Sequence, residues 1–325
     1  MADPESRRWR LLQVEASFAC NLECVMCPWR GEEREAENQG LMRDETWAAI
    51  VPHLPEIDAV DFTGGGEPTL HPRLPEWIAT AHAAGCTTGF LSNGFTLDEV
   101  ISRAVIDAGL SWICISMDGA TADVYEEIRP GSDFATVTKN VERLGALRRN
   151  GVPKTMINFV MMPQNIHQAE DMVRLAARLG VDQVNLKQAD VVRGRHGKGF
   201  ALYAPEEDRA IRRMKKQLAK ARKVAKKLGV ATTAFSFTPR EKPVCEQDPR
   251  SSMFVRYDGR VAGCIGLAIG GPTTFLGREV LVPTCLYGRL PDQDLLEIWE
   301  GDACRARRET RYLRCEEPRL AVANP

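Results

Sequence analysis

The alternation of strand-like and helix-like segments is the feature that most restricts how this 325-residue chain can fold. Runs with the composition of β-strands occur at 11–17, 58–64, 87–93, 111–118, 154–162 and 181–188. Segments such as 97–109 and 165–180 repeat apolar residues every three or four positions and end in glycine, as helices do. Parallel strands need crossover connections of this kind. We therefore predict an α/β fold, a partial (β/α)6 TIM-like barrel, with its chemistry at the carboxyl ends of the strands.

The composition of the chain changes near residue 235. Residues 205–229 are predicted to form one long helix with an apolar stripe and a basic opposite face. We expect that basic face to be solvated, with contact to nucleic acid as the alternative. Beyond the helix, cysteine, glycine and proline dominate. The prediction is a barrel domain over 1–235 and a small, loop-rich domain over 236–325.

Charge and hydropathy argue against several classes of partner. The 43 basic and 44 acidic residues leave a formal charge of −1, so no global field favours nucleic acid or an anionic membrane. No run approaches the roughly 18 to 20 apolar residues of a membrane-spanning helix, and the N-terminal residues lack an apolar signal core. We predict a cytoplasmic protein without nucleic-acid or membrane partners.

The cysteines fall into two groups that indicate metal, cluster or redox chemistry. Eight of the ten belong to them: Cys20, Cys24 and Cys27, then Cys245, Cys264, Cys285, Cys304 and Cys315. A long chain without an export signal is not expected to use so many cysteines for disulfide bonds. The other two cysteines are predicted to be small core residues.

The first group has the spacing C-x3-C-x2-C, directly after the first predicted strand. Three thiolates do not complete a four-ligand zinc site, and the nearest histidines, His53 and His71, lack a standard zinc spacing to them. Three cysteines do suit three irons of a [4Fe-4S] cluster and leave one iron for a ligand from outside the protein.

This loop resembles the signature of the radical S-adenosylmethionine (radical SAM) superfamily. The resemblance implies that the amino and carboxylate groups of S-adenosylmethionine bind the open iron. It also implies a set of cofactor-binding residues at the following strand ends, which is Gly64, Gly65, Gly66, Glu67, Ser92, Asn93, Ser116, Asp118, Arg129 and Met26.

The resemblance implies a role for several of these residues. The glycine stretch lets the methionine moiety approach, Ser116 and Asp118 stand where the family contacts the ribose, and Arg129 takes the carboxylate. Met26 replaces an aromatic residue that often packs near adenine in the family. The structural alternatives are an ordinary turn for the glycine stretch, a β-turn for Ser92-Asn93-Gly94 and a surface ion pair for Arg129.

The second cysteine group resembles the auxiliary-cluster domain called SPASM, or its shortened form, twitch. The resemblance rests on Cys245 and Cys264, with Gly259 between them in a C-x13-G-x4-C pattern. The intervening MFVRYDGRVAGC is predicted to form a hairpin that turns at Asp258-Gly259. Residues 286–309 resemble the glycine turn and short helix of that domain.

The ligand set of the second group is incomplete relative to the family. Cys315 stands at the first place of an expected C-x2-C pair, but Pro318 occupies the second. We therefore predict one auxiliary [4Fe-4S] cluster, with Cys245, Cys264, Cys285 and Cys315 as ligands. Cys304 competes with Cys285 for its place, and a structural zinc site is the alternative to iron.

The resemblance implies the reaction. The reduced cluster cleaves S-adenosylmethionine, and the resulting 5′-deoxyadenosyl radical abstracts hydrogen from the substrate. The compact second domain resembles that of aminocyclitol and aminoglycoside dehydrogenases, which predicts oxidation of an alcohol in a small polar substrate. The auxiliary cluster would accept an electron, and an external donor such as flavodoxin or ferredoxin would reduce the first cluster.

Three alternatives remain open. A radical epimerase would use a cysteine as hydrogen donor, and Cys304 is the candidate. A peptide- or protein-modifying maturase is the second, disfavoured here because only about ten residues precede the first strand. The third is an iron–sulfur electron-transfer protein without enzymatic activity.

No side chain is marked by its sequence context as the general base. His196 and Asp190 are candidates by position, because the loop at 191–200 follows the sixth predicted strand.

Overall fold

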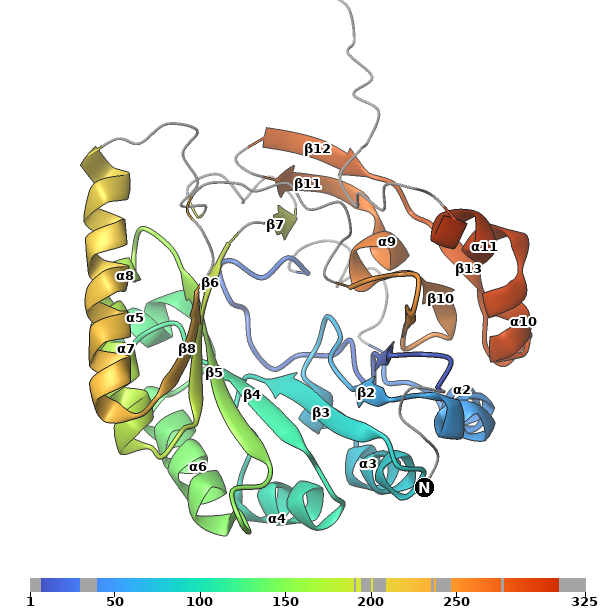
Figure 1. The fold of residues 1–325 in the computed structure, drawn as a ribbon, viewed down its shortest axis with the longest axis horizontal. Coiled ribbons are helices and arrows are strands. Elements are labelled where there is room, and N and C mark those ends of the chain that lie inside the picture. Colours follow the sequence, from blue (N-terminus) through green and yellow to red (C-terminus); the bar gives the residue numbers. More distant parts are fainter. Residues whose placement is uncertain are drawn as a thin grey trace, which may run out of the picture.

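The computed structural model describes residues 7–29, 40–189, 191–193, 200, 209–234, 237, 247–275 and 278–309. A ten-stranded sheet curves through this part of the chain, and helices lie along its outer side (Figure 1). The strand order is β13-β10-β9-β1-β2-β3-β4-β5-β6-β8. This arrangement confirms the predicted α/β fold.

The six strands predicted from the sequence are all present, and neighbours pair in parallel in sequence order. Their bounds are β1 Leu11–Val14, β2 Ala59–Asp61, β3 Thr87–Ser92, β4 Trp112–Ser116, β5 Lys154–Met161 and β6 Gln183–Gln188. A further strand, β8 (Ala231–Ala234), continues the sheet in parallel beside β6. The carboxyl ends of the strands therefore meet at one edge of the sheet.

Helices connect these strands. They are α2 Asp44–Ile50, α3 Leu74–Ala83, α4 Glu99–Asp107, α5 Ala122–Ile128, α6 Phe134–Leu147, α7 Ala169–Arg178 and α8 Arg209–Leu228, with 3-10 helices η2 Val51–Glu56, η3 Pro68–Leu70 and η4 Ile166–Gln168. Carboxylates cap the starts of α4 and α6: Asp98 accepts from the Ile101 N–H at α4, and Asp133 accepts from the Thr136 N–H at α6. Such caps satisfy N–H groups that a helix start leaves without partners.

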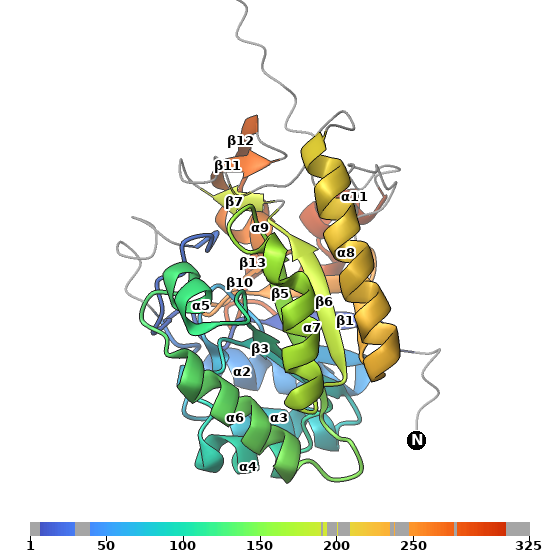
Figure 2. The same cartoon turned by 90° about the vertical axis from the view of Figure 1, so that its left-hand side faces the viewer.

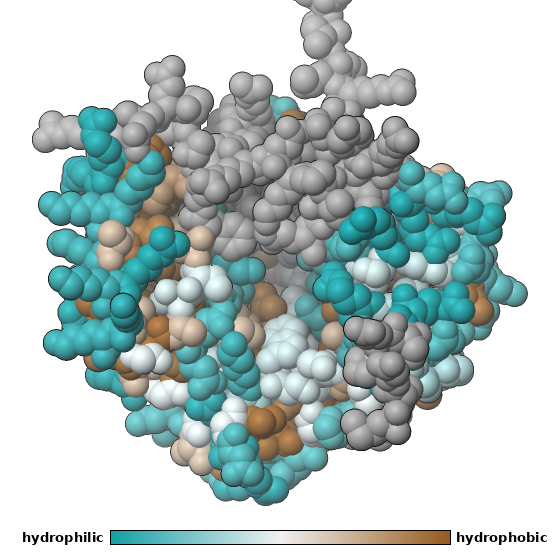
Figure 3. All heavy atoms as spheres, in the orientation of Figure 1, coloured by the Kyte–Doolittle hydropathy of each residue, from teal (hydrophilic) through white to brown (hydrophobic). Residues whose placement is uncertain are grey.

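The long helix α8 packs beside α7 on the outside of the sheet (Figure 2). Its predicted apolar stripe is buried at Ile211, Leu218, Ala221 and Ala225. Hydrophilic residues cover the edge of the molecule where Figure 1 places α8 (Figure 3). None of the described helices is both long and apolar enough to cross a bilayer.

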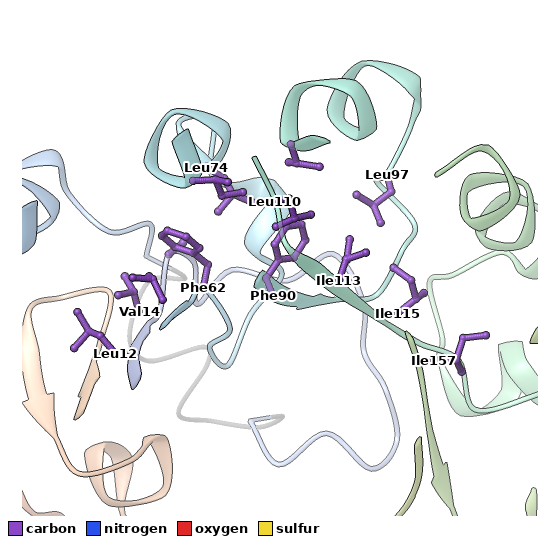
Figure 4. Close-up of a cluster of buried hydrophobic side chains, with 14 of the residues drawn as sticks. Leu12, Val14, Phe62, Leu74, Phe90, Leu97, Leu110, Ile113, Ile115 and Ile157 are labelled. Carbon is purple, nitrogen blue, oxygen red and sulfur yellow. The ribbon is translucent and has the colours of Figure 1, made fainter. Parts of the chain in front are cut away.

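The core lies between the sheet and the helices. Phe90 of β3 and Ile113 and Ile115 of β4 are buried there, near Leu97 and Leu110 (Figure 4). Successive residues of a strand point to opposite faces. Cys114 and Ser116, which alternate with Ile113 and Ile115 in β4, therefore face the inner side of the barrel. The same alternation places polar residues of β2, β5 and β6 on that inner side.

The C-terminal part adds a hairpin to the same sheet. Strands β9 (Ser252–Val255) and β10 (Arg260–Ala262) pair antiparallel, and the predicted turn at Asp258-Gly259 is present, with φ +86° at Gly259. β9 also pairs in parallel with β1, and β13 (Leu286–Arg289) pairs with β10. One sheet thus runs through both predicted domains, whose division at residue 235 stays a prediction.

The remaining elements surround that hairpin. They are β7 Val191–Arg193, β11 Gly271–Phe275 and β12 Arg278–Val282, which form a second sheet, and the helices α9 Ile265–Ile269, α10 Leu295–Glu300 and α11 Asp302–Glu309. Figure 1 shows α10 and α11 at the opposite end of the molecule from α8.

Candidate active site

A pocket of about 280 Å³ lies where the cysteine loop crosses the carboxyl ends of the strands. Its lining is Cys20, Leu22, Cys24, Met26, Cys27, Pro28, Trp29, Thr63, Gly64, Gly65, Gly66, Glu67, Leu91, Ser92, Asn93, Ser116, Arg129, Val160, Gln188 and Ala189. All but one of the residues predicted to bind the first cluster or S-adenosylmethionine are in this set. The exception is Asp118.

The three cysteines of the first group are free thiols, and each is partly exposed at the pocket. Backbone hydrogen bonds fasten their loop to the end of α5 and the chain that follows it: the Val25 N–H donates to Ile128 O at 3.0 Å, and the Glu23 N–H donates to Pro130 O at 3.1 Å. Burial raises the pKa of the Cys24 thiol to about 11, although Arg129 lowers it. A bound metal overrides such a shift, because a coordinating thiol is deprotonated outright.

The cysteine loop fits an iron–sulfur cluster better than a single metal ion. Within the part of the chain that the structure describes, no group of three His, Cys, Asp or Glu side chains is arranged to hold one metal ion. A zinc site would require its thiolates to converge on one centre, whereas each cysteine of a cluster binds its own iron.

The glycines after β2 are required by contacts with the chain that follows β1. A Cβ on Gly64 would lie 2.2 Å from Cγ of Glu15, and one on Gly66 would lie 2.2 Å from the carbonyl oxygen of Ala19. Real Cβ atoms do not approach other atoms so closely. The glycine stretch therefore packs directly on the cysteine loop while its backbone also lines the pocket.

Glu67 joins the loops after β2 and β3. It is 2% exposed. Its Oε1 accepts from Ser92 Oγ at 2.9 Å and Thr69 Oγ1 at 2.6 Å, and its Oε2 accepts from the Asn93 N–H at 2.6 Å. Burial raises the pKa of this carboxyl, while these donors favour its anion. Asn93 in turn donates through Nδ2 to Asn21 Oδ1 at 2.8 Å, which connects the network to the cysteine loop.

Arg129 and Asp118 form a buried ion pair beside the cysteines. The Arg129 Nε donates to Asp118 Oδ2 at 2.8 Å, and its Nη1 donates to Cys24 Sγ at 3.4 Å. Asp118 is fully buried, and its Oδ1 accepts from the Val160 N–H at 2.6 Å. Asp118 therefore lies behind Arg129, where it orients the guanidinium, and not at the pocket surface where a ribose contact was predicted.

The remaining predicted residues of the pocket come from the loop and from β4. Met26 is 8% exposed and packs with Ile128, Met162 and Ala189. It thus forms an apolar part of the wall. Ser116 stands at the end of β4 and faces the pocket, as its alternation with Ile115 predicts.

Two carboxylates beside the pocket were missed from the sequence. Glu15, just after β1, is fully buried against the glycine stretch. Asp61 of β2 faces the inner side of the barrel and accepts from the Thr63 N–H at 3.0 Å. Burial raises the pKa of Asp61 to about 6, which Thr63 and Lys187 oppose. Alternation with the pocket residue Thr63 is a signal that would have found Asp61.

The second cysteine group is described in part. Cys264 precedes α9, and Cys285 lies between β12 and β13, where its N–H donates to Leu267 O at 2.8 Å. Both thiols are partly exposed and pack in one apolar cluster with Phe254 and Leu267. Cys304 lies in α11, is 1% exposed and belongs to the main core.

The hydroxyl of Tyr287 in β13 responds to charge on all three of these cysteines. Burial raises the pKa of its hydroxyl, and negative charge on Cys304, Cys285 and Cys264 raises it further. Both competitors for one ligand place, Cys285 and Cys304, therefore contribute to this shift of the Tyr287 pKa. The predicted ligands Cys245 and Cys315, and the candidate bases His196 and Asp190, lie outside the described residues.

Comparison with known families gives two matches that together span most of the chain. A model of the Radical SAM superfamily matches residues 14–176. A model of the SPASM iron-sulfur cluster-binding domain matches residues 245–319. The first match contains the entire cysteine loop and the residues that line the pocket up to Val160.

Individual proteins resemble the chain along most of its length. A tungsten-containing aldehyde ferredoxin oxidoreductase cofactor-modifying protein of Pyrococcus furiosus is 24% identical and covers 90% of this chain and 81% of its own. The PqqA peptide cyclase of Ruegeria pomeroyi is 26% identical, with 92% and 76% covered. The crystal structure of Streptococcus suis SuiB bound to S-adenosylmethionine has the same fold, with a TM-score of 0.67 at 13% identity and 93% and 68% covered.

Proposed function

Because this chain belongs to the Radical SAM superfamily, we propose that it is an enzyme that modifies a peptide substrate after abstracting a hydrogen atom from it. Its two domains bind a [4Fe-4S] cluster with S-adenosylmethionine and auxiliary iron–sulfur, respectively. The observation that carries the proposal is the single pocket in which three free cysteines, the glycine stretch and Arg129 meet. The peptide class is supported by the PqqA peptide cyclase, which aligns with 92% of this chain.

The proposed peptide modification replaces the function predicted from the sequence, which was oxidation of a sugar or aminocyclitol alcohol. Curated relatives that align with most of the chain include a peptide cyclase, which favours the maturase alternative. The epimerase alternative loses its candidate donor, because Cys304 is 1% exposed in α11 and does not line the pocket. Among the described residues of the pocket, the only thiols are those of the cysteine loop.

In this proposal the pocket residues hold the cofactors in place. Cys20, Cys24 and Cys27 would bind three irons and leave the fourth for S-adenosylmethionine. When bound and reduced, the cluster supplies the electron that cleaves S-adenosylmethionine to a 5′-deoxyadenosyl radical, which takes hydrogen from the substrate.

Arg129 contributes positive charge beside the cysteine loop. A guanidinium has five N–H donors, and the contacts with Asp118 and Cys24 use three of them. The remaining donors can take the carboxylate of S-adenosylmethionine. Asp118 keeps the guanidinium in place, since it is buried and held by the Val160 N–H.

Asp61 is the proposed proton acceptor of the reaction. Oxidation of a substrate radical releases a proton, and a carboxylate with a pKa of about 6 is mostly ionised at pH 7. Asp61 is linked to the pocket through Thr63, which lines it. An auxiliary iron–sulfur cluster held by the second cysteine group would accept the electron that leaves the substrate, and an external flavodoxin or ferredoxin would reduce the first cluster.

The test is anaerobic reconstitution followed by an assay for 5′-deoxyadenosine. The protein receives dithionite, S-adenosylmethionine and either a panel of short synthetic peptides or a panel of polyols and aminocyclitols. We expect one peptide to stimulate 5′-deoxyadenosine formation and to lose hydrogen by mass spectrometry. Stimulation by a polyol, with a ketone as product, would overturn the peptide proposal in favour of alcohol oxidation.

A matched pair of variants separates catalysis from folding in this assay. Cys24→Ala removes a proposed cluster ligand, whereas Cys86→Ala removes a buried thiol that donates to Leu54 O and Ile57 O, away from the pocket. Only Cys24→Ala should abolish the reaction. Equal activity in both variants would show that the cysteine loop does not hold the catalytic cluster.

A further inference from the structure

Three segments of the chain meet at a buried carboxylate that does not line the pocket. Glu15, just after β1, has no exposed surface. The Gly65 N–H donates to its Oε1 at 2.7 Å, and the Tyr257 N–H donates to its Oε2 at 3.3 Å. Each carboxylate oxygen therefore holds a different segment: the glycine stretch after β2, and the turn of the hairpin between β9 and β10.

Arg256 of the hairpin places a positive charge near the carboxylate of Glu15. Arg256 is 1% exposed, and its Nε lies 3.9 Å from Glu15 Oε2 while its Nη1 lies 3.2 Å from Asp258 Oδ2. Its guanidinium carbon is 5.4 Å from the ring centre of Phe18 and 5.0 Å from that of Tyr257. These two rings stack at 5.6 Å with 14° between their planes, and Phe18 belongs to the chain that leads into the cysteine loop.

The glycine stretch has no room to shift toward this junction. A Cβ on Gly64 would overlap Glu15, and a Cβ on Gly65 would lie 2.6 Å from Cε2 of Phe18. Closely packed interiors transmit small displacements, because they do not deform smoothly. A change at Glu15 or Arg256 must therefore reach the backbone of the glycine stretch.

We propose that Glu15 is a positioning residue that fixes the glycine stretch for S-adenosylmethionine, and that Arg256 of the auxiliary hairpin holds Glu15 in this role. The inference rests on the proposed role of Gly64, Gly65 and Gly66 in binding S-adenosylmethionine. Neither side chain lines the pocket, so both act through backbone positions. Because coupling between sites is reciprocal, the hairpin that leads to Cys264 and the S-adenosylmethionine pocket influence each other.

The first experiment measures the affinity of the reconstituted protein for S-adenosylmethionine by anaerobic equilibrium dialysis. Glu15→Gln keeps the shape of the side chain but presents an amide N–H where one oxygen accepted a hydrogen bond. We expect about tenfold weaker binding, the usual effect of one lost buried hydrogen bond. Arg256→Met should weaken binding by a similar factor, and Arg256→Lys, which keeps the charge, by less.

Asp182→Asn is the matched control. Like Glu15, the Asp182 carboxylate contacts both an arginine and a backbone N–H. It pairs with Arg148 at 2.5 Å and accepts from the Thr155 N–H at 2.7 Å. It stands before β6, at the amino end of the strands and thus at the edge opposite the pocket. Binding of S-adenosylmethionine should be unchanged in this variant.

A pH profile distinguishes positioning from a general loss of structure. Burial raises the pKa of Glu15 to about 7, while Gly65, Tyr257 and Arg256 favour the anion and Asp258 opposes it. Only the anion accepts both N–H groups, so wild-type affinity should rise from pH 6 to pH 8. Among the described residues, the titratable or charged groups that act on Glu15 or respond to its charge are Arg256, Asp258 and Tyr257, all from the hairpin. Glu15→Gln should lack this rise.

The outcomes separate the inference from the function on which it rests. If the wild type binds S-adenosylmethionine, and Glu15→Gln and Arg256→Met retain their iron and bind S-adenosylmethionine as tightly as the wild type at all pH values, the inference is wrong and the proposed function stands. If the fully loaded wild type does not bind S-adenosylmethionine, the proposed function is wrong as well.

Discussion

The two cysteine groups of this protein are positioned in different ways. Cys20, Cys24 and Cys27 share one loop that hydrogen bonds to the chain after α5. The described members of the second group come from three separate places: the start of α9, the connection between β12 and β13, and the helix α11. The first group is therefore defined by local chain geometry, and the second by how distant elements pack.

Their surroundings differ as well. The first group lies beside the Arg129–Asp118 ion pair and a network of polar side chains that converges on Glu67. The described members of the second group lie among apolar residues. A charged, hydrogen-bonded setting suits a site that binds a polar cofactor, whereas an apolar setting suits a cluster that only exchanges electrons.

The largest expected difference between the two groups is in the cleavage of S-adenosylmethionine. Cys24→Ala should reduce formation of 5′-deoxyadenosine at least about a thousandfold, since it removes the cluster that drives the step. Cys264→Ala should retain cleavage while it abolishes modification of the peptide. Both variants should lose about four irons per chain, as counted by chemical analysis. Loss of cleavage in Cys264→Ala to the same degree would remove the distinction between the groups.

The second prediction decides the ligand of the auxiliary site. Cys285 packs against the apolar cluster that also includes Cys264, as well as against the main core, whereas Cys304 belongs to the main core alone. Cys285→Ser should therefore lose about four irons, and Cys304→Ser should keep them. Loss of iron in Cys304→Ser but not in Cys285→Ser would identify Cys304 as the cluster ligand instead. Zinc in place of iron and sulfide in the purified protein would contradict an auxiliary cluster altogether.

The third prediction concerns stability at the first site. Arg129→Met leaves Asp118 buried without its cation and should lower the free energy of unfolding by about 3 kcal/mol. Arg103→Met removes an exposed pair with Glu99 and should change it by less than about 0.5 kcal/mol. Urea midpoints of the two variants measure the difference. Equal midpoints would show that the Arg129–Asp118 pair does not support the fold.

The last prediction concerns the dependence of stability on pH at the junction between the two regions. The pKa of Glu15 is raised from 4.5 to about 7, so the folded state binds more protons than the unfolded state between these values. The contribution of Glu15 to stability is thus full below about pH 4.5 and falls as pH rises to 7, by up to about 3 kcal/mol. The urea midpoint of the wild type, relative to that of Glu15→Gln, should fall over this range. A constant difference would contradict the raised pKa.

The sequence alone predicted those parts of the site that are formed by residues close together in the chain. The cysteine loop, the glycine stretch and Ser92-Asn93 stand in order at strand ends, and strand alternation placed Ser116 toward the pocket. The hairpin at Asp258-Gly259 was also predicted from the sequence, because two adjacent residues are enough to indicate its turn.

The sequence was insufficient where residues far apart in the chain act together. Asp118 and Arg129 were each identified, but their pairing, which moves Asp118 away from the pocket surface, depends on how the chain after α5 returns to β4. Glu15 was missed because its partners Tyr257 and Arg256 lie about 240 residues later, on a hairpin that pairs with β1. When two strands as far apart in the chain as β1 and β9 pair in parallel, a single sequence contains no pattern that reveals the pairing.

The central claim is that this pocket directs a radical to a peptide, and isotope transfer tests it most directly. The peptide that stimulates cleavage most strongly is prepared with deuterium at its carbon-bound positions and incubated with the reduced, reconstituted protein and S-adenosylmethionine. We predict that the 5′-deoxyadenosine gains one deuterium and that the peptide loses it, as measured by mass spectrometry. Formation of 5′-deoxyadenosine without deuterium from the labelled peptide would contradict the proposed reaction.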